Sequence, residues 1–381
     1  MNQKIIKIEN NYLELENYLI KNNHRNIFLV CGNSIKNQNI YNYLNELKKR
    51  LDININYFSD FKPNPQYESV CLGVTKFKEK KYDLIIAIGG GSAIDVAKCI
   101  KLYSNLDSKT NYLEQPIIPN DIPFIVIPTT AGTGSESTEF AVIYYKGKKQ
   151  SIKDKSIIPN VIVFDSTLLN TLPLYQKKVT VLDAFSHAIE AMWSLNSNLD
   201  SIEYAKEALK LIINNMYIYF NESNQHVNDK MFEAANLAGK AINISQTTAG
   251  HAMCYKLSML YNISHGHAAA LINSELLPYM IKNIDKCIDE RGKDYLYKIF
   301  EELMIVFKCE NMESLNEYIR QLLTDLDLYS LNVNYGDIDV LVKSVNPTRM
   351  KNNPIELNSD DIKKIYTSLF NEIEKRKNED K

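Results

Sequence analysis

The sequence has no apolar run that approaches the roughly 20 residues of a membrane-spanning helix. Its first residues lack the apolar core of a signal peptide. Neither sign of charge is in excess, because 44 Lys and Arg stand against 46 Asp and Glu, for a formal net charge of -2. This balance gives no electrostatic reason to expect a nucleic acid or an acidic membrane as a partner. We therefore expect a cytoplasmic protein that binds neither.

Cysteine is scarce and follows no regular spacing. The six cysteines are scattered, and most of them lie in apolar segments. We interpret them as reduced thiols and not as a disulfide framework or a cysteine-based zinc site. No internal repeat or low-complexity linker interrupts the 381 residues, and about two domains are expected for a chain of this length.

The chain changes character near residues 172–180. Before this point, short apolar runs alternate with helical stretches, which predicts a parallel sheet with helices on both faces. After it, strand patterns fade and long helical patterns take over. We predict an α/β dinucleotide-binding domain over residues 1–175 and an all-helical metal- and substrate-binding domain over residues 176–381. The expected strands include residues 26–31, 53–58, 83–91, 123–130, 140–145 and 161–165, the last two joined by a polar, lysine-rich link.

Histidine is concentrated in one short stretch, GHAMCYKLSMLYNISHGH. It contains His251, His265 and His267, three of the six histidines. An unbroken helix would hold the first two about 21 Å apart. Asn262 and the turn-forming residues 264–266 allow the chain to reverse and bring them together.

Asp183 and His187 lie upstream, four residues apart in a predicted helix, so they share one helix face. With His251 and His265 they form a set of one carboxylate and three imidazoles, donors that suit Fe(II) or Zn(II). The alternative is that these are unrelated polar residues on amphipathic helices, the usual explanation for a single Asp-x-x-x-His pair. Four candidates in two short segments favour a metal site.

Two loops rich in small residues follow predicted buried strands. The first, GGGS at residues 89–92, precedes a helix, where bare backbone N–H groups suit a phosphate. A tight turn that needs positive φ is an equally good explanation of these glycines. The second loop, TTAGTGSE at residues 129–136, ends another buried strand. Both loops fall at carboxyl ends of strands, where open α/β sheets bind their ligands.

Four motifs now stand in order along the chain: GGGSAIDVAK, PTTAGTGSE, DAFSHAIEA and a His-x13-His-Gly pair. They resemble the iron-containing alcohol dehydrogenases, and the resemblance covers nearly the whole chain from residue 26. It implies an iron-type metal and NAD(H) or NADP(H), with metal and substrate held between the two domains. The implied metal ligands are Asp183, His187, His251 and His265. The implied cofactor contacts are Gly89, Gly90, Gly91, Ser92, Asp95, Thr129, Thr130, Thr133, Asn64 and, in a loose alignment, Lys149.

Two positions depart from the family pattern. Tyr255 stands where many members have a histidine with a role in proton transfer, so Tyr255, His267 or water remains to supply the proton. Gly32 stands where many NAD-using members carry an Asp that would bond the ribose 2′-OH. The absence of this Asp leaves room for a 2′-phosphate beside Ser34 and Lys36, which favours NADP(H). The alternative is that Lys36 is only a solvated charge.

The resemblance implies an enzyme that reduces a small aldehyde to a primary alcohol. Residues 237–257 and 346–357 are similar to the phosphonoacetaldehyde reductase branch, which implies 2-hydroxyethylphosphonate as the product. A phosphonate needs cationic contacts, for which Lys240 and Arg349 are the candidates. The alternatives are a generic short-chain alcohol dehydrogenase or lactaldehyde reductase, a cyclising lyase of the dehydroquinate synthase type, and a non-catalytic descendant. We expect a homodimer.

Overall fold

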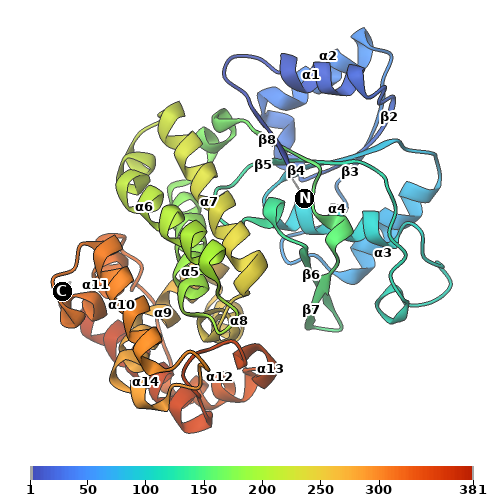
Figure 1. The fold of residues 1–381 in the computed structure, drawn as a ribbon. Coiled ribbons are helices and arrows are strands. Elements are labelled where there is room, and N and C mark those ends of the chain that lie inside the picture. Colours follow the sequence, from blue (N-terminus) through green and yellow to red (C-terminus); the bar gives the residue numbers. More distant parts are fainter. Residues whose placement is uncertain (1–2, 380–381) are drawn as a thin grey trace. The chain divides into compact units, whose positions relative to one another are not determined.

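The computed structural model describes residues 3–379 and divides the chain into two compact units (Figure 1). The N-terminal unit ends at Leu172 and also takes in Ser223–Phe232, whereas the helical unit comprises Pro173–Glu222 and the chain from Glu233 onward. The predicted boundary between residues 175 and 176 lies close to the first junction, but the prediction has no counterpart for the second segment. The predicted outer limits, residues 1 and 381, lie outside the described residues.

The N-terminal unit is built around a six-stranded sheet of order β1-β8-β5-β4-β2-β3, in which all neighbouring strands are parallel. Its strands are β1 (Lys4–Lys7), β2 (Asn26–Cys31), β3 (Asn54–Phe58), β4 (Leu84–Gly89), β5 (Phe124–Pro128) and β8 (Val161–Phe164). Its helices are α1 (Leu13–Lys21), α2 (Asn39–Arg50), α3 (Tyr67–Lys78) and α4 (Gly91–Tyr103). The predicted α/β class is confirmed.

Alternate residues of the central strands are buried against opposite layers of helices. Ile27 and Leu29 of β2 belong to the core formed with α1 and α2. Phe28 and Val30 belong to the core formed with α3 and α4. Figure 1 shows the two helix pairs on opposite faces of the sheet. Burial on both faces explains why these strands appear in the sequence as unbroken apolar runs.

A second, two-stranded sheet corrects one prediction. β6 (Phe140–Tyr145) and β7 (Lys148–Lys153) pair antiparallel, joined by Lys146 and Gly147 with φ of 49° and 72°. The polar link expected after residue 145 is therefore a strand. Its pattern is weak because Ile152 is the one buried residue of β7. β1 and α1 are also absent from the prediction.

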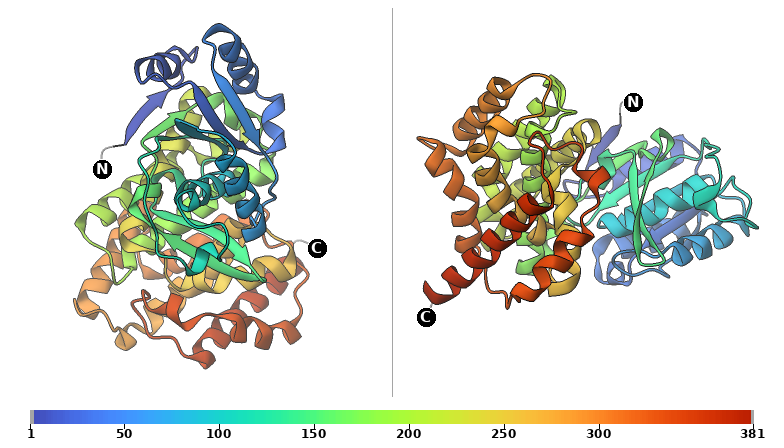
Figure 2. Two further views of the ribbon diagram at one scale, coloured as in Figure 1. Left: turned by 90° about the vertical axis from the view of Figure 1, so that its right-hand side faces the viewer. Right: turned by 90° about the horizontal axis from the view of Figure 1, so that it is seen from below.

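The second unit is helical, as predicted. Its helices are α5 (Leu174–Trp193), α6 (Leu199–Asn221), α7 (Gln225–Ser245), α8 (Ala249–Tyr261), α9 (His265–Lys282), α10 (Lys293–Phe307), α11 (Met312–Asp325), α12 (Ile338–Ser344), α13 (Pro347–Met350) and α14 (Ser359–Glu379). α7 begins within the segment assigned to the N-terminal unit. α9 is central, because α5, α8, α11 and α14 all pack against it, and the C-terminal helices appear in red in Figure 2. Within residues 3–379, no helix has the length and apolar character needed to span a membrane.

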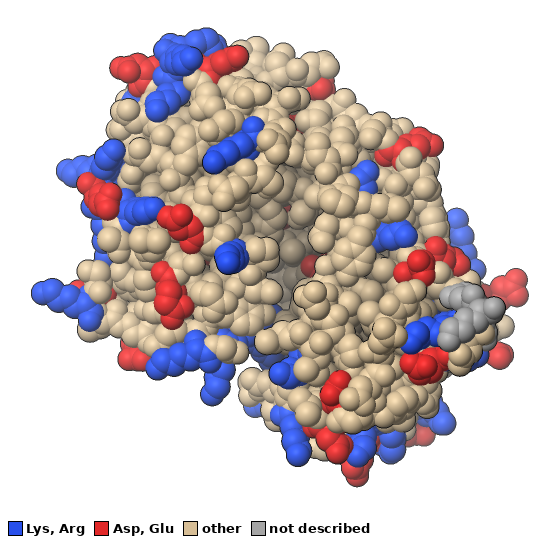
Figure 3. All heavy atoms as spheres, turned by 180° about the vertical axis from the view of Figure 1, so that it is seen from behind, with Lys and Arg blue, Asp and Glu red and all other residues tan. Residues whose placement is uncertain are grey.

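Short 3-10 helices complete the connections. They are η1 (Asn33–Asn37), η2 (Tyr112–Glu114), η3 (Ser135–Ser137), η4 (Lys155–Ile157), η5 (Ser166–Thr171), η6 (Ile284–Lys286) and η7 (Tyr335–Asp337). On the face drawn in Figure 3, basic and acidic side chains are interspersed, in keeping with the nearly balanced composition.

α9 approaches α5 very closely at Gly266. A Cβ atom at this position would lie 2.1 Å from the backbone oxygen of Val179 and 2.7 Å from Cβ of Asp183. Real Cβ atoms do not come so near to backbone, so only glycine permits this spacing. The glycine that follows His265 in the sequence therefore sets how close α9 lies to Asp183.

We predict that Gly266→Ala destabilises the protein by about 1–3 kcal/mol, the usual cost of overpacking a core. Alanine is otherwise a better helix former than glycine by about 1 kcal/mol, so a loss of stability would report the contact itself. Urea unfolding measures the change. Gly336→Ala is the matched control in the same unit, since its nearest neighbour is the Asn334 side chain at 3.3 Å. Equal stability of the two variants would contradict the prediction.

Candidate functional site

A buried carboxylate and two imidazoles meet between α5 and α8. Asp183 and His187 share one face of α5, and His251 comes from the first turn of α8. His251 Nε2 lies 3.6 Å from Asp183 Oδ1, and His187 Nε2 lies 4.0 Å from the same oxygen. The ligand atoms of the three residues all lie within 4.8 Å of one another, as a shared metal ion requires.

The donors fit a cation. Asp183 Oδ1 and His251 Nε2 are buried and have no hydrogen-bond partner among the described residues. Leaving such atoms unpaired costs about 1–3 kcal/mol each, whereas a metal ion would satisfy both. Burial by itself would raise the pKa of Asp183, but the neighbouring imidazoles, His187 foremost, hold this pKa below its usual range. The carboxylate is therefore charged and ready to bind a metal.

His265 lies beside this trio. α8 ends at Tyr261, Asn262 adopts the left-handed conformation with φ of 50°, and α9 begins at His265, so the chain reverses where the sequence predicts. The ring of His265 lies 5.2 Å from the ring of His251, and its Nδ1 is 3.3 Å from Cys254 Sγ. All four predicted ligands thus lie in the helical unit, three of them clustered and the fourth adjacent.

Glu190 is a residue of this site that is not among those predicted from the sequence. It is fully buried one turn beyond His187 on α5, and its Oε1 lies 2.6 Å from Nδ1 of His251. Burial would raise the pKa of Glu190, but His251 outweighs this effect and the pKa falls to about 2. For His251, burial would lower the pKa, but Glu190 and Asp183 raise it to about 9.

The two residues predicted to handle the proton lie in different surroundings. His267 is buried, with Nε2 2.7 Å from the carbonyl oxygen of Leu328 and Nδ1 3.2 Å from the hydroxyl of Tyr175. Both ring nitrogens of His267 are therefore engaged by groups that lie against α9, and this does not support a role for His267 in proton transfer. Tyr255 stacks on His265, with ring centroids 5.0 Å apart, and so lies next to the ligand set.

The two predicted cofactor loops touch each other. A Cβ atom at Gly90 would lie 3.1 Å from Thr130 Oγ1, and one at Gly91 would lie 2.9 Å from Thr133 Cγ2. The backbone of Thr129 also donates to Gly89 O at 3.1 Å. Neither Gly90 nor Gly91 has positive φ, so these two glycines serve close approach of the loops, whereas Gly89, with φ of 156°, adopts a conformation that favours glycine.

Two charged residues of α4, Lys98 and Asp95, hold the second loop in place through hydrogen bonds. Lys98 is fully buried and donates to the carbonyl oxygens of Ser135, Thr138 and Phe140 at 2.6–2.8 Å. Burial lowers the pKa of Lys98 to about 8 against the opposing effect of Asp95.

Asp95, a predicted cofactor contact, accepts from the Ser135 hydroxyl at 2.7 Å and from the Val142 backbone at 3.1 Å. These bonds engage its carboxylate in holding the second loop. Ser92 lies in the first turn of α4, which no side chain caps and which therefore offers backbone N–H groups to a ligand.

The remaining cofactor candidates lie in varied settings. Gly32 has φ of -74° and precedes η1, which carries Ser34 and Lys36. Ser34 and Lys36 are exposed. Asn64 is exposed and left-handed, with φ of 58°. Lys149 lies on β7, near enough to Asp95 to lower its pKa slightly against the larger effect of burial.

The two predicted anion contacts differ in their relation to the metal cluster. The Arg349 guanidinium of α13 lies 5.0 Å from the ring centroid of Tyr255. Tyr255 in turn stacks against His265. Lys240 instead lies 6.0 Å from the ring of Tyr204 on α6. Arg349 is therefore linked to the ligand set through stacked rings, whereas Lys240 is not.

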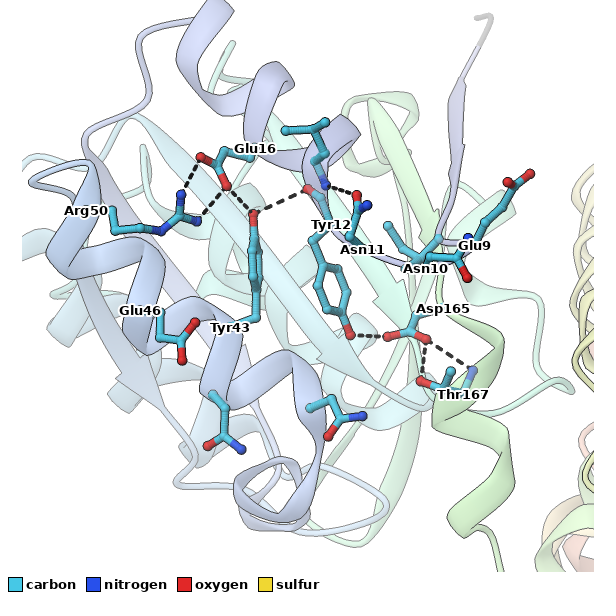
Figure 4. A pocket seen from close by; sticks show the side chains of 14 residues that line it. Glu9, Asn10, Asn11, Tyr12, Glu16, Tyr43, Glu46, Arg50, Asp165 and Thr167 are labelled. Carbon is cyan, nitrogen blue, oxygen red and sulfur yellow. Dashed lines mark hydrogen bonds and ion pairs between the residues drawn. The ribbon is translucent and has the colours of Figure 1, made fainter.

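A pocket of about 550 Å³ in the N-terminal unit lies apart from these residues (Figure 4). None of the predicted site residues lines it. Glu16 pairs with two other residues that line it, because Arg50 donates two hydrogen bonds to its carboxylate at 2.9 and 2.7 Å and Tyr43 donates a third. Tyr12 donates to Asp165 on the other side.

Two family models match the chain, one after the other. The model for iron-containing alcohol dehydrogenase matches residues 2–166, and the model for the C-terminal part of the Fe-containing alcohol dehydrogenase family matches residues 178–370. The chain belongs to the iron-containing alcohol dehydrogenase family. This membership confirms the resemblance seen in the four motifs and identifies an oxidoreductase of the alcohol dehydrogenase type.

Individual relatives agree with the assignment. The NADPH-dependent butanol dehydrogenase of Clostridium saccharobutylicum is 28% identical over 362 residues, which cover 90% of this chain and 91% of that protein. The aldehyde-alcohol dehydrogenase of Streptococcus pneumoniae is 32% identical over 260 residues, 63% of this chain but only 29% of that longer protein. The sulfoacetaldehyde reductase of Bifidobacterium kashiwanohense, solved with NAD+, matches in fold with a TM-score of 0.82 at 24% identity, covering 96% of each chain.

Proposed function

We propose that this protein reduces a small aldehyde to a primary alcohol with a divalent metal ion and NAD(P)H. The observation that carries the proposal is the buried cluster of Asp183, His187 and His251, in which two ligand atoms have no other partner. His265 completes the set as the fourth ligand after a small side-chain movement. One carboxylate and three imidazoles suit Fe(II), with Zn(II) as the second choice.

The cofactor would lie on the two touching loops of the N-terminal unit. The uncapped first turn of α4, at Gly91 and Ser92, offers N–H groups for the pyrophosphate. Gly90, Thr129, Thr130 and Thr133 would line the rest of the dinucleotide, with Asn64 and Lys149 nearby. Asp95 and Lys98 would not contact the cofactor but would fix the shape of the second loop through their hydrogen bonds.

The chemistry divides between the bound groups and the chain. When bound, the metal ion supplies a Lewis acid for the substrate oxygen and the nicotinamide supplies the hydride. Asp183 and the histidines hold a charged, water-poor site at a fixed place in the helical unit. Tyr255 lies beside the ligand set, so we propose it, or a water molecule, as the proton source in place of His267.

We propose NADPH as the preferred reductant. Gly32 leaves space where a carboxylate would repel a 2′-phosphate, and Ser34 and Lys36 are exposed close by. The butanol dehydrogenase relative is NADPH-dependent by name.

For the substrate we propose phosphonoacetaldehyde, a two-carbon aldehyde that carries a strong anion. Arg349 supplies the argument, because its guanidinium lies over Tyr255, which stacks on His265. No carboxylate pairs with Arg349 among the described residues, so the charge is available to an anion. Guanidinium groups bind phosphonate oxygens in pairs. The structural neighbour named sulfoacetaldehyde reductase points to the same kind of substrate, an aldehyde with a strong anion.

Gly32→Asp should reverse the cofactor preference. The new side chain fits, because a Cβ atom at Gly32 meets nothing closer than Ser34 Oγ at 3.8 Å. Repulsion of the 2′-phosphate should lower kcat/KM for NADPH at least about tenfold relative to NADH, which corresponds to about 1.4 kcal/mol. Gly32→Asn, of equal size and no charge, is the control. A wild-type enzyme with a lower KM for NADH would refute the NADPH proposal.

Arg349→Ala should reduce kcat/KM for phosphonoacetaldehyde about ten- to a hundred-fold, as expected when a charge-assisted bond worth about 1.5–3 kcal/mol is lost. Propanal, which carries no anion, should lose much less. Lys240→Ala is the matched control, since it also removes one cation. If it lowers kcat/KM for phosphonoacetaldehyde but not for propanal, Lys240 belongs to the anion site as well. Equal losses for both aldehydes, or a wild-type preference for propanal, would indicate a generic short-chain alcohol dehydrogenase.

A further inference from the structure

We propose that Glu190 is a positioning residue that fixes the ring of His251 with Nε2 turned toward Asp183. The proposal rests on the proposed metal-dependent function, since the oriented nitrogen is the one that would bind the metal. The observation behind it is a hydrogen bond of 2.6 Å between Glu190 Oε1 and His251 Nδ1, with both side chains buried.

The chemistry of this bond dictates the state of the imidazole. An ionised carboxylate can only accept hydrogen bonds, so His251 Nδ1 must carry the proton that it donates to Glu190. In a neutral ring, the other nitrogen is then bare and able to bind a metal ion. His251 Nε2 is the nitrogen that lies 3.6 Å from Asp183 Oδ1. Glu190 therefore selects both the tautomer and the direction of the ligand, a common arrangement behind metal-bound histidines.

Glu190 also holds the backbone that carries His251. Its Oε2 accepts from the backbone N–H of Thr248 at 2.6 Å, from the Thr248 hydroxyl at 2.9 Å and from the backbone N–H of His251 at 3.3 Å. Thr248 is the N-cap of α8 and supplies no side-chain cap of its own. The carboxylate of Glu190 takes that place, where a negative charge is favoured by the helix dipole.

Helix α9 also contributes a hydrogen bond to Glu190. Asn273 of α9 donates Nδ2 to Glu190 Oε1 at 3.0 Å. A Cβ atom at Gly250 would lie 2.4 Å from Glu190 Oε1 and 2.1 Å from Asn273 Oδ1. The glycine before His251 therefore makes room for the carboxylate and the amide, just as the glycine after His265 makes room for α5.

Glu190→Gln tests the proposal with little change of shape. The amide group cannot accept from all of these donors, so His251 should lose its fixed orientation. Metal-free wild type and variant are titrated with Co(II), followed by visible absorption. We expect binding of Co(II) about ten- to a hundred-fold weaker in the variant, with a changed absorption spectrum. Glu190→Asp, which keeps the charge but shortens the reach, should show the same loss.

Asn273→Ala is the control for a purely structural role. It removes a partner of Glu190 but leaves the bond to His251 in place, so Co(II) affinity should stay within about threefold of wild type and the spectrum should be unchanged. Equal weakening in Asn273→Ala and Glu190→Gln, or wild-type affinity and spectrum in Glu190→Gln, would overturn the proposal.

A measurement on wild type decides the matter even if the variants do not fold. In the Zn(II)-loaded protein with 15N-labelled histidine, His251 should show a protonated Nδ1 and a metal-bound Nε2. Metal bound through Nδ1 would overturn the proposal. If wild type binds neither Co(II) nor Zn(II), the proposed metal-dependent function fails; if it binds them through a site indifferent to Glu190, only the present inference fails.

Discussion

The helical unit depends on one constraint, which is that the buried carboxylate of Asp183 must be balanced by positive charge. Two imidazoles face it within 4.0 Å, and a second buried carboxylate, Glu190, stands behind one of them. Carboxylates out of water are tolerated only when they are paired and hydrogen-bonded. The close packing of α5, α8 and α9 follows from this need, and glycines at positions 250 and 266 make that packing sterically possible.

In the N-terminal unit, too, a buried charge must be hydrogen-bonded, and here the charge belongs to Lys98. Lys98 donates to three carbonyl oxygens at the end of the second loop and just after it, while Asp95, on the same helix as Lys98, accepts from the Ser135 hydroxyl. Backbone carbonyls that a loop leaves unpaired in the interior are thereby satisfied. The result is a pair of adjoining loops in which residues 89–92 and the threonines at 129, 130 and 133 remain partly exposed, which is the surface that a dinucleotide needs.

Much of this architecture is predictable from the sequence, and the exceptions have physical reasons. The apolar runs of β2, β4 and β5 identify a doubly covered sheet because both faces of each strand are buried. The four-residue spacing of Asp183 and His187 fixes their shared face on α5. β7 is missed because Ile152 is its one apolar and buried residue, so periodicity carries little information.

Other features depend on tertiary contacts that no local pattern encodes. Glu190 appears in the sequence as the one polar residue between Ala188 and Trp193, and only the approach of α8 and α9 gives it partners. The one sequence clue is its position, a turn beyond His187 in an otherwise apolar run. His267 looks like a second functional histidine beside His265, yet helical rotation directs it into the packing against Leu328.

The most direct test of the metal site is X-ray absorption spectroscopy on the protein loaded with Fe(II) or Zn(II). We predict one metal ion per chain, bound by nitrogen and oxygen donors with outer-shell scattering typical of several imidazoles. A sulfur neighbour at about 2.3 Å, which would implicate Cys254, or the absence of a stoichiometric metal would contradict this account.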